Sequence, residues 1–170
     1  MIQAKITDSK ITSNSLEAFS LHEKSRFGEK KEGKIEYSPI EALFLTSEKK
    51  ISILSGKKPV KEETLLKKLK KQDKRIETKL VAFRDLRKKG YILKTALKYG
   101  ADFRVYERGI RPGEDHARWV LFVTKESEPL SWSDFAGKNR IAHSIKKNLL
   151  IAIVDEEGDV SYYSVSWMRP

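Results

Sequence analysis

Three side chains in the second half of this chain have the types and spacing for proton transfer to and from an anion: Tyr106, His116 and Lys147. Tyr106 and His116 stand on either side of a Gly/Pro turn, residues 109–113, that the sequence predicts between two strands. An imidazole exchanges protons at about pH 6.5. A phenol has a pKa of about 10 and becomes a useful base only where nearby cations lower that pKa.

Cleavage of RNA by its own 2′-hydroxyl needs this kind of set. One group removes the 2′ proton, a second protonates the departing 5′ oxygen, and a cation stabilises the extra charge on the pentavalent phosphate. His116 is the predicted acid and Lys147 the predicted cation. Tyr106 is either the base, activated by Arg104 and Arg108, or a group that orients the 2′-hydroxyl. The sequence contains no clustered Asp/Glu pattern of a two-metal nuclease, so we expect neither metal nor cofactor.

Lys147 is expected on a helix over residues 139–147, because at about 100° per residue Arg140 and Lys147 then share one face. His143 lies on the same predicted helix and is read as a structural or polar-surface histidine. This segment alone does not distinguish a functional face from a solvated one. Its position in the same predicted domain as Tyr106 and His116 favours function.

The rest of this half is rich in predicted strands, at residues 91–96, 102–107, 116–124, 149–154 and 160–167. Trp119 and Trp132 are expected in the core. Trp167, at the end of the last strand and near Arg169, is expected either in the core or stacked on a splayed base. The acidic stretch from Asp155 to Asp159 is too short for a calcium-binding EF-hand and predicts a hairpin turn.

The first half mixes short strands and helices. Strands are predicted at residues 2–6 and 51–54, a polar loop at 28–33, and helices from the capping boxes at 14–17 and 38–41 and over 61–71 and 73–89. The sequence therefore predicts an α+β protein. A small N-terminal α+β domain, residues 1–75, precedes a C-terminal domain, residues 76–170, in which helices pack on a mixed β-sheet.

Composition restricts the partner and the compartment. The 170 residues include 35 Lys and Arg against 24 Asp and Glu, a net charge of +11, which favours a polyanionic partner such as nucleic acid over a merely solvated surface. The absence of cysteine excludes disulfides and thiolate chemistry. No signal peptide or membrane-spanning run is recognisable, so we expect a cytoplasmic protein without a membrane partner. No helix-turn-helix, zinc finger or basic zipper predicts DNA binding.

Several stretches together resemble one known family, the archaeal tRNA-splicing endonucleases. They cover nearly all of residues 76–170, and only their combination is specific. The matching residues are Arg87-x-x-Gly-Tyr91, Lys98-Tyr-Gly-Ala-Asp-Phe-Arg104, Tyr106-Glu-Arg-Gly109, His116, Arg140-Ile-Ala-His-Ser-Ile-Lys-Lys147, Ile151-Ala-Ile-Val-Asp155 and Gly158-Asp159. The first half fits the family's smaller domain by position and length.

The resemblance implies a metal-independent endoribonuclease that excises introns from precursor tRNA at a bulge-helix-bulge, leaving 2′,3′-cyclic phosphate and 5′-hydroxyl ends. The family's catalytic Tyr, His and Lys fall on Tyr106, His116 and Lys147; Lys146 is adjacent, but the spacing favours Lys147. Arg140 matches one half of a clamp on a flipped bulge base, with Trp167 a substitute for the other.

The resemblance also implies an assembly. The acidic turn resembles a loop that inserts into a neighbouring subunit, and its predicted interface residues are Asp155, Glu156, Glu157 and Asp159. A substrate with two cut sites requires two active sites, so we expect a symmetric assembly. Because the chain carries both domains and all three catalytic residues, the resemblance implies a self-sufficient subunit of a homotetramer or dimer of dimers. A catalytic chain that needs a different partner, and a non-catalytic RNA-binding subunit of a processing complex, remain the alternatives.

Overall fold

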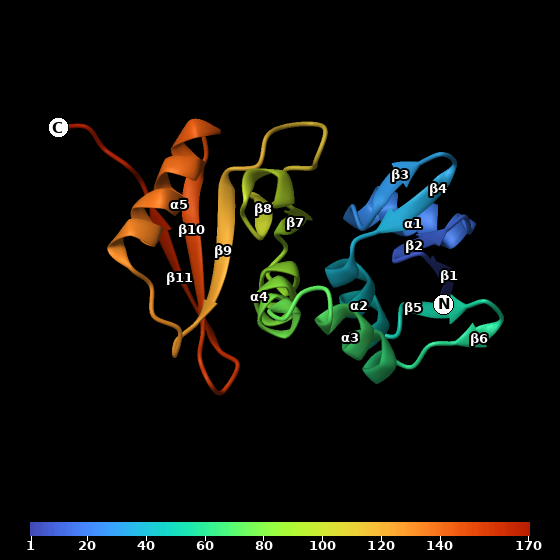
Figure 1. Ribbon diagram of the computed structural model, residues 1–170. Coiled ribbons are helices and arrows are strands. Elements are labelled where there is room, and N and C mark those ends of the chain that lie inside the picture. The colour runs from blue at the N-terminus through green and yellow to red at the C-terminus, as the bar shows by residue number, and fades with distance from the viewer. The chain divides into compact units, whose positions relative to one another are not determined.

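The computed structural model describes all residues from 1 to 170. The chain forms two compact units, Met1–Leu80 and Val81–Pro170, each built on its own mixed sheet (Figure 1). This confirms the predicted α+β class. The division falls inside helix α4 (Ile76–Lys88), so the domain boundary at residue 75 stays a prediction. None of the helices has both the length and the apolar character needed to cross a membrane.

The first unit contains a six-stranded sheet in the order β3-β4-β2-β1-β5-β6, in which only β1 and β5 run parallel. Buried side chains alternate with exposed ones along β1, as expected for a sheet with one face on a core. The elements are β1 (Ile2–Thr7), β2 (Lys10–Ser13), α1 (Leu16–Ser25), β3 (Glu29–Lys31), β4 (Lys34–Tyr37), α2 (Pro39–Ser47), β5 (Ile51–Ser55), β6 (Lys58–Pro59) and α3 (Glu62–Lys70).

Helix α2 begins with the predicted capping box. The Ser38 hydroxyl accepts the Glu41 N–H, and the Glu41 carboxylate accepts the Ser38 N–H at 3.0 Å. The same carboxylate is buried and accepts the Gly28 N–H at 3.0 Å. Glu41 therefore joins the start of α2 to the segment before β3, a contact that no local pattern predicts.

Two expectations for this unit were wrong. Residues 28–33, predicted as a loop, contain strand β3, which pairs with β4 as a hairpin. Strands β2, β4 and β6 were not predicted at all. Helix α1 starts at Leu16 and is capped by Ser15 rather than Asn14, because the Ser15 hydroxyl accepts the Ala18 N–H at 3.2 Å. The short, charged strands β2 and β3 carry too few apolar residues to reveal themselves by alternation.

The second unit is a five-stranded sheet in the order β11-β10-β9-β8-β7, in which only β9 and β10 run parallel. Helix α5 makes the crossover that a parallel pair requires. The elements that follow α4 are β7 (Ile92–Thr95), the 3₁₀ turn η1 (Leu97–Tyr99), β8 (Phe103–Tyr106), β9 (Trp119–Lys125), α5 (Trp132–Ser144), β10 (Asn148–Val154) and β11 (Val160–Val165).

Helices α4 and α5 cover opposite faces of this sheet. Ala142 of α5 packs in a buried cluster with Val120 and Leu149 of the central strands. On the other face Phe83 of α4 meets Phe103, with ring centroids 5.6 Å apart. Residues directly opposite each other in neighbouring strands share a face, and Arg104 pairs with Val120. Arg104 and its face-mate two residues later, Tyr106, therefore lie on the α5 side.

Candidate active site

The strand register brings the ends of three strands to one edge of the second sheet. Trp119, the first residue of β9, pairs with Val105 on one side and Asn148 on the other. Tyr106 directly follows Val105, and Lys147 directly precedes Asn148. The phenol of Tyr106 and the ammonium of Lys147 thus come from neighbouring positions along this edge, although 41 residues separate them in the sequence.

Residues 139–144 are helical as predicted, but the helix ends before Lys147, so the predicted C-terminal bound at residue 147 was wrong. Helix α5 starts seven residues earlier, at Trp132, and ends at Ser144. Lys146 then takes the left-handed conformation, with φ 54°, and its N–H donates to His143 O while Lys147 N–H donates to Ala142 O. This pair of backbone hydrogen bonds is a Schellman motif, which ends a helix and turns the chain away from the helix axis. The helical face that Arg140 and Lys147 were expected to share does not exist.

The ammonium of Lys147 nevertheless reaches the histidine loop. It donates to the Ala117 carbonyl at 2.8 Å, directly after His116. The His116 imidazole is exposed to solvent. The strand predicted from residue 116 starts only at Trp119, and the His116 N–H donates to the Asp115 carboxylate at 2.6 Å. His116 therefore lies on a loop beside Lys147.

The base of this loop is held by two arginines on aromatic rings. Arg118 forms an ion pair with Glu107 across the loop and stacks on Trp119, with 4.8 Å from guanidinium carbon to ring centroid. Arg108 lies 5.5 Å from the Tyr91 ring. The ion pair joins a residue that follows Tyr106 to one that follows His116, and so restrains the distance between the two.

A second phenol, Tyr99, which the sequence did not single out, is affected by the charge of Lys147. Tyr99 closes the turn η1 and packs partly buried against the cluster that contains Ala142. Its pKa lies below the usual value, first because of a hydrogen bond with Lys98 and further because of the charges of Lys98, Arg104 and Lys147. Three cations thus act on one position, an environment that attracts a phosphate.

Arg140 and Trp167 line a common pocket, to which Tyr106, His116 and Lys147 do not contribute. The pocket lies between α5 and the segment that follows β11, and Trp167 stacks on His143 with ring centroids 4.6 Å apart. His143 is exposed, which agrees with the polar-surface reading, but sequence reasoning missed it as a pocket residue. The spacing Phe135, Asn139 and His143, four residues apart, was the signal available, since such residues share one helix face.

The tryptophans differ from expectation. Trp132 is 84% exposed, so its prediction as a core residue was wrong: it is the first residue of α5, beyond the buried cluster, and it touches only the edge of Phe135 among aromatic rings. Trp119 is partly buried against Tyr91. Trp167 lies beyond the end of β11 and is half-exposed.

The acidic stretch between β10 and β11 is a turn, as predicted. One Asp155 carboxylate oxygen accepts the N–H groups of Glu157 and Asp159, at 3.0 and 2.8 Å. Asp155 therefore shapes the turn, whereas Glu156, Glu157 and Asp159 present their side chains to solvent.

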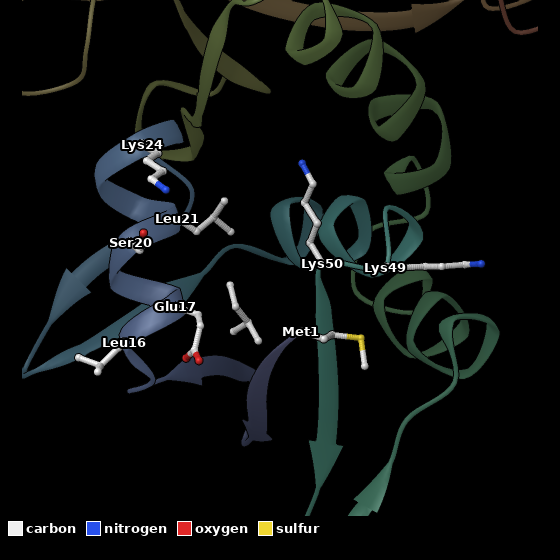
Figure 2. Close-up of a pocket in the computed structure, with 9 residues that line it drawn as sticks. Met1, Leu16, Glu17, Ser20, Leu21, Lys24, Lys49 and Lys50 are labelled. Carbon is white, nitrogen blue, oxygen red and sulfur yellow. The ribbon is translucent and has the colours of Figure 1, made fainter.

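A further cavity, of about 610 Å³, belongs to the first unit (Figure 2). It lies between α1 and the start of β5, and none of the predicted site residues contributes to it. Its lining consists of Met1, Ile2, Leu16, Glu17, Ser20, Leu21, Lys24, Lys49 and Lys50.

Comparison with known proteins identifies both units. Residues 76–162 match the tRNA intron endonuclease catalytic C-terminal domain, and residues 2–66 match the tRNA intron endonuclease N-terminal domain. The tRNA-splicing endonuclease of Thermococcus gammatolerans is 39% identical over 149 residues, which are 88% of this chain and 87% of that protein. That of Methanothermobacter thermautotrophicus is 39% identical over 150 residues, with 88% and 87% covered. That of Methanococcus maripaludis is 37% identical over 169 residues, with 99% and 95% covered. The chain therefore belongs to the tRNA intron endonuclease family.

Proposed function

We propose that this protein excises introns from precursor tRNA as a metal-independent endoribonuclease that acts at a bulge-helix-bulge. The observation that carries the proposal is the meeting of Tyr106, the His116 loop and Lys147 at one edge of the sheet, within a domain of the tRNA intron endonuclease family. These three side chains supply every charge and proton that internal attack by a 2′-hydroxyl requires.

In the proposed reaction Tyr106 orients the 2′-hydroxyl or accepts its proton as the 2′-oxygen bonds to phosphorus. The bond from phosphorus to the 5′-oxygen breaks, and the His116 imidazolium protonates that oxygen. One fragment then ends in a 2′,3′-cyclic phosphate and the other in a 5′-hydroxyl. Lys147 holds the Ala117 carbonyl with one of its three N–H groups, which leaves two for the oxygens of the pentavalent phosphate.

Arg140 and Trp167 would hold an unpaired bulge base beside this site. Their common pocket supports the proposal, because a guanidinium and an indole both stack on nucleobases. The net charge of +11 supports binding of RNA, because Lys and Arg side chains neutralise its phosphates.

Two cut sites in one substrate call for two active sites in one particle, so we propose a symmetric homo-oligomer, a homotetramer in the simplest case. The exposed carboxylates of Glu156, Glu157 and Asp159 are suited to bind a basic surface on a second subunit. Each copy of the chain carries 35 Lys and Arg residues, which can provide such a surface.

The test is incubation of the purified chain with a bulge-helix-bulge RNA in EDTA, followed by identification of the fragment ends. We expect two cuts, each leaving a cyclic phosphate and a 5′-hydroxyl. Cleavage that requires added metal, or that leaves a 5′-phosphate, contradicts the mechanism. Salt-dependent binding without fragments, with cleavage restored by a second protein, supports the alternative of a non-catalytic subunit.

A further inference from the structure

The pocket between α5 and the segment after β11 has the composition of a site for one nucleobase. Its volume is about 460 Å³, within the usual range for small-molecule sites. It contains no carboxylate that would repel RNA. Its six lining residues are Phe135, Ala136, Asn139, Arg140, His143 and Trp167.

The rings provide the faces of the pocket. Trp167 is 51% exposed, with His143 against it at 4.6 Å and the Arg169 guanidinium 5.9 Å from its ring centroid. Phe135 and Ala136 form an apolar wall. Stacking of a base on aromatic rings and arginine planes is strong but tolerates any base, because every base has a π-face. Arg140 and Trp167 therefore account for binding and give no choice among bases.

Asn139 adds a group that can choose. It lies one helical turn after Phe135 and one before His143, so it shares their face of α5 and lines the same pocket. Its amide carries a donor and an acceptor side by side. That pair matches the adjacent amino donor and ring-nitrogen acceptor on adenine edges, the usual partner of asparagine in nucleic-acid readout.

We propose that this pocket selects the identity of the unpaired base it receives and prefers adenine, with Asn139 as the residue that reads the base edge. His143 is a positioning residue that holds the Trp167 indole as the facing wall. The inference rests on the proposed function, since it assumes an RNA with unpaired bases, and it adds sequence preference to recognition of shape.

The test uses bulge-helix-bulge RNAs that carry a 2′-deoxy residue at each cut site and are therefore not cleaved. Each bulge position in turn carries A, G, C or U, and the dissociation constant is measured for every RNA. We expect one position at which the protein binds A roughly 5- to 150-fold more tightly than the other bases. Asn139→Ala should reduce this preference to less than about twofold, because the variant lacks the bidentate contact with the base edge.

Two further variants separate reading from stacking. Trp167→Ala should weaken binding of all four RNAs by a similar factor and leave their order unchanged. Ser133→Ala, an exposed position on the same helix outside the pocket, should behave as the unaltered protein. Retained helical circular dichroism excludes unfolding of Asn139→Ala, a partly buried surface position.

Equal affinity for the four bases at every position overturns the inference, as does a preference that survives Asn139→Ala or that favours a base other than adenine. Cleavage of the matching all-ribose RNAs is followed separately. Failure there contradicts the proposed endonuclease, whereas uniform cleavage together with uniform binding contradicts only base selection.

Discussion

The Lys147 ammonium donates to the carbonyl of Ala117 at 2.8 Å, so the residue directly before β10 is bonded to the residue after His116. This contact joins the start of β10 to the loop that precedes β9. Asn148 N–H donates to Arg118 O at 3.0 Å and extends the same junction along the backbone. The position of the cation and the position of the acid are thus set by one local arrangement, although different parts of the chain supply them.

The first prediction separates the two adjacent lysines. Lys147→Ala should lower the single-turnover cleavage rate by about 10²- to 10³-fold, because it removes the charge that stabilises the pentavalent phosphate. Lys146→Gly should keep the rate and leave the free energy of unfolding unchanged or up to about 1 kcal/mol higher, since Lys146 holds a left-handed conformation that glycine adopts without strain. Rapid-quench kinetics and urea unfolding measure both. Loss of activity in Lys146→Gly with an active Lys147→Ala would reverse the assignment.

A second prediction concerns His116 as the acid. His116→Ala should slow cleavage by about 10²-fold or more without affecting the fold, because the side chain is exposed on a loop. Replacing the departing 5′ oxygen by sulfur makes a leaving group that needs no proton. On this RNA we expect His116→Ala to approach the unaltered protein, while Lys147→Ala stays slow. Equal defects on both RNAs would show that His116 acts in some way other than proton donation.

The sequence was sufficient to predict the α+β class and the second sheet, because β9 and β10 carry long apolar runs. It was not sufficient to place Lys147. The spacing of Arg140, Ser144 and Lys147 is helical, but the helix ends at Ser144. The residue in the left-handed conformation that ends it is Lys146, whereas the usual sequence signal for such an end is a glycine. Helical spacing is a property of residue order, whereas a Schellman turn depends on backbone hydrogen bonds that spacing does not reveal.

Long-range contacts account for other differences. Trp132 is apolar enough for a core, yet its place at the first turn of α5 leaves it 84% exposed. The hairpin of β3 and β4 depends on Gly28, whose backbone packs against β4. Neither the exposure of a tryptophan nor the close approach of a glycine to a neighbouring strand follows from residue pattern, because both are fixed by packing.

A third prediction follows from that glycine. Gly28 has φ +72°, and a Cβ added there would lie 2.3 Å from Cγ2 of the fully buried Ile35. Gly28→Ala should therefore lower the free energy of unfolding by about 2 to 4 kcal/mol. Gly33, at the other end of β3, has nearly the same φ, +73°, with no atom near the added Cβ. Gly33→Ala should lose only about 1 to 2 kcal/mol. Urea unfolding compares the two, and equal losses would contradict a steric cause.

A fourth prediction concerns the contact between β11 and α4. The Tyr162 hydroxyl donates to Asp85 at 2.7 Å, and Lys89 pairs with the same carboxylate at 2.7 Å. Burial, reinforced by the hydrogen bond and the charge of Asp85, raises the pKa of Tyr162 above its ordinary value. The pKa of Tyr162 is higher in the folded state than in the unfolded state, where it is about 10. The contribution of its hydroxyl to the free energy of unfolding is therefore fully present below about pH 10 and is lost as pH rises above that value.

Tyr162→Phe should accordingly lower the free energy of unfolding by about 1 to 2 kcal/mol at pH 8. The difference between the two proteins should shrink as pH rises to about 11, since only the unaltered protein gains a phenolate at this position on unfolding. Comparison with the variant removes the effect of all other tyrosines. A difference that stays constant from neutral to alkaline pH would show that the hydroxyl contributes nothing through its ionisation.

The last prediction tests assembly through the acidic turn. Changing Asp155 would disturb the turn itself, because its carboxylate accepts two backbone N–H groups there. Glu156→Lys with Glu157→Lys reverses two exposed charges and leaves that support intact. If these carboxylates meet a basic surface of another subunit, the double variant should shift from the tetramer to smaller species in light scattering and lose cleavage of the two-site RNA, because repulsion replaces attraction at each contact. The matched control is Glu62→Lys with Glu63→Lys on α3, which changes the total charge equally at another exposed pair. An unaltered mass for the turn variant, or the same loss in both, would place the subunit contact elsewhere.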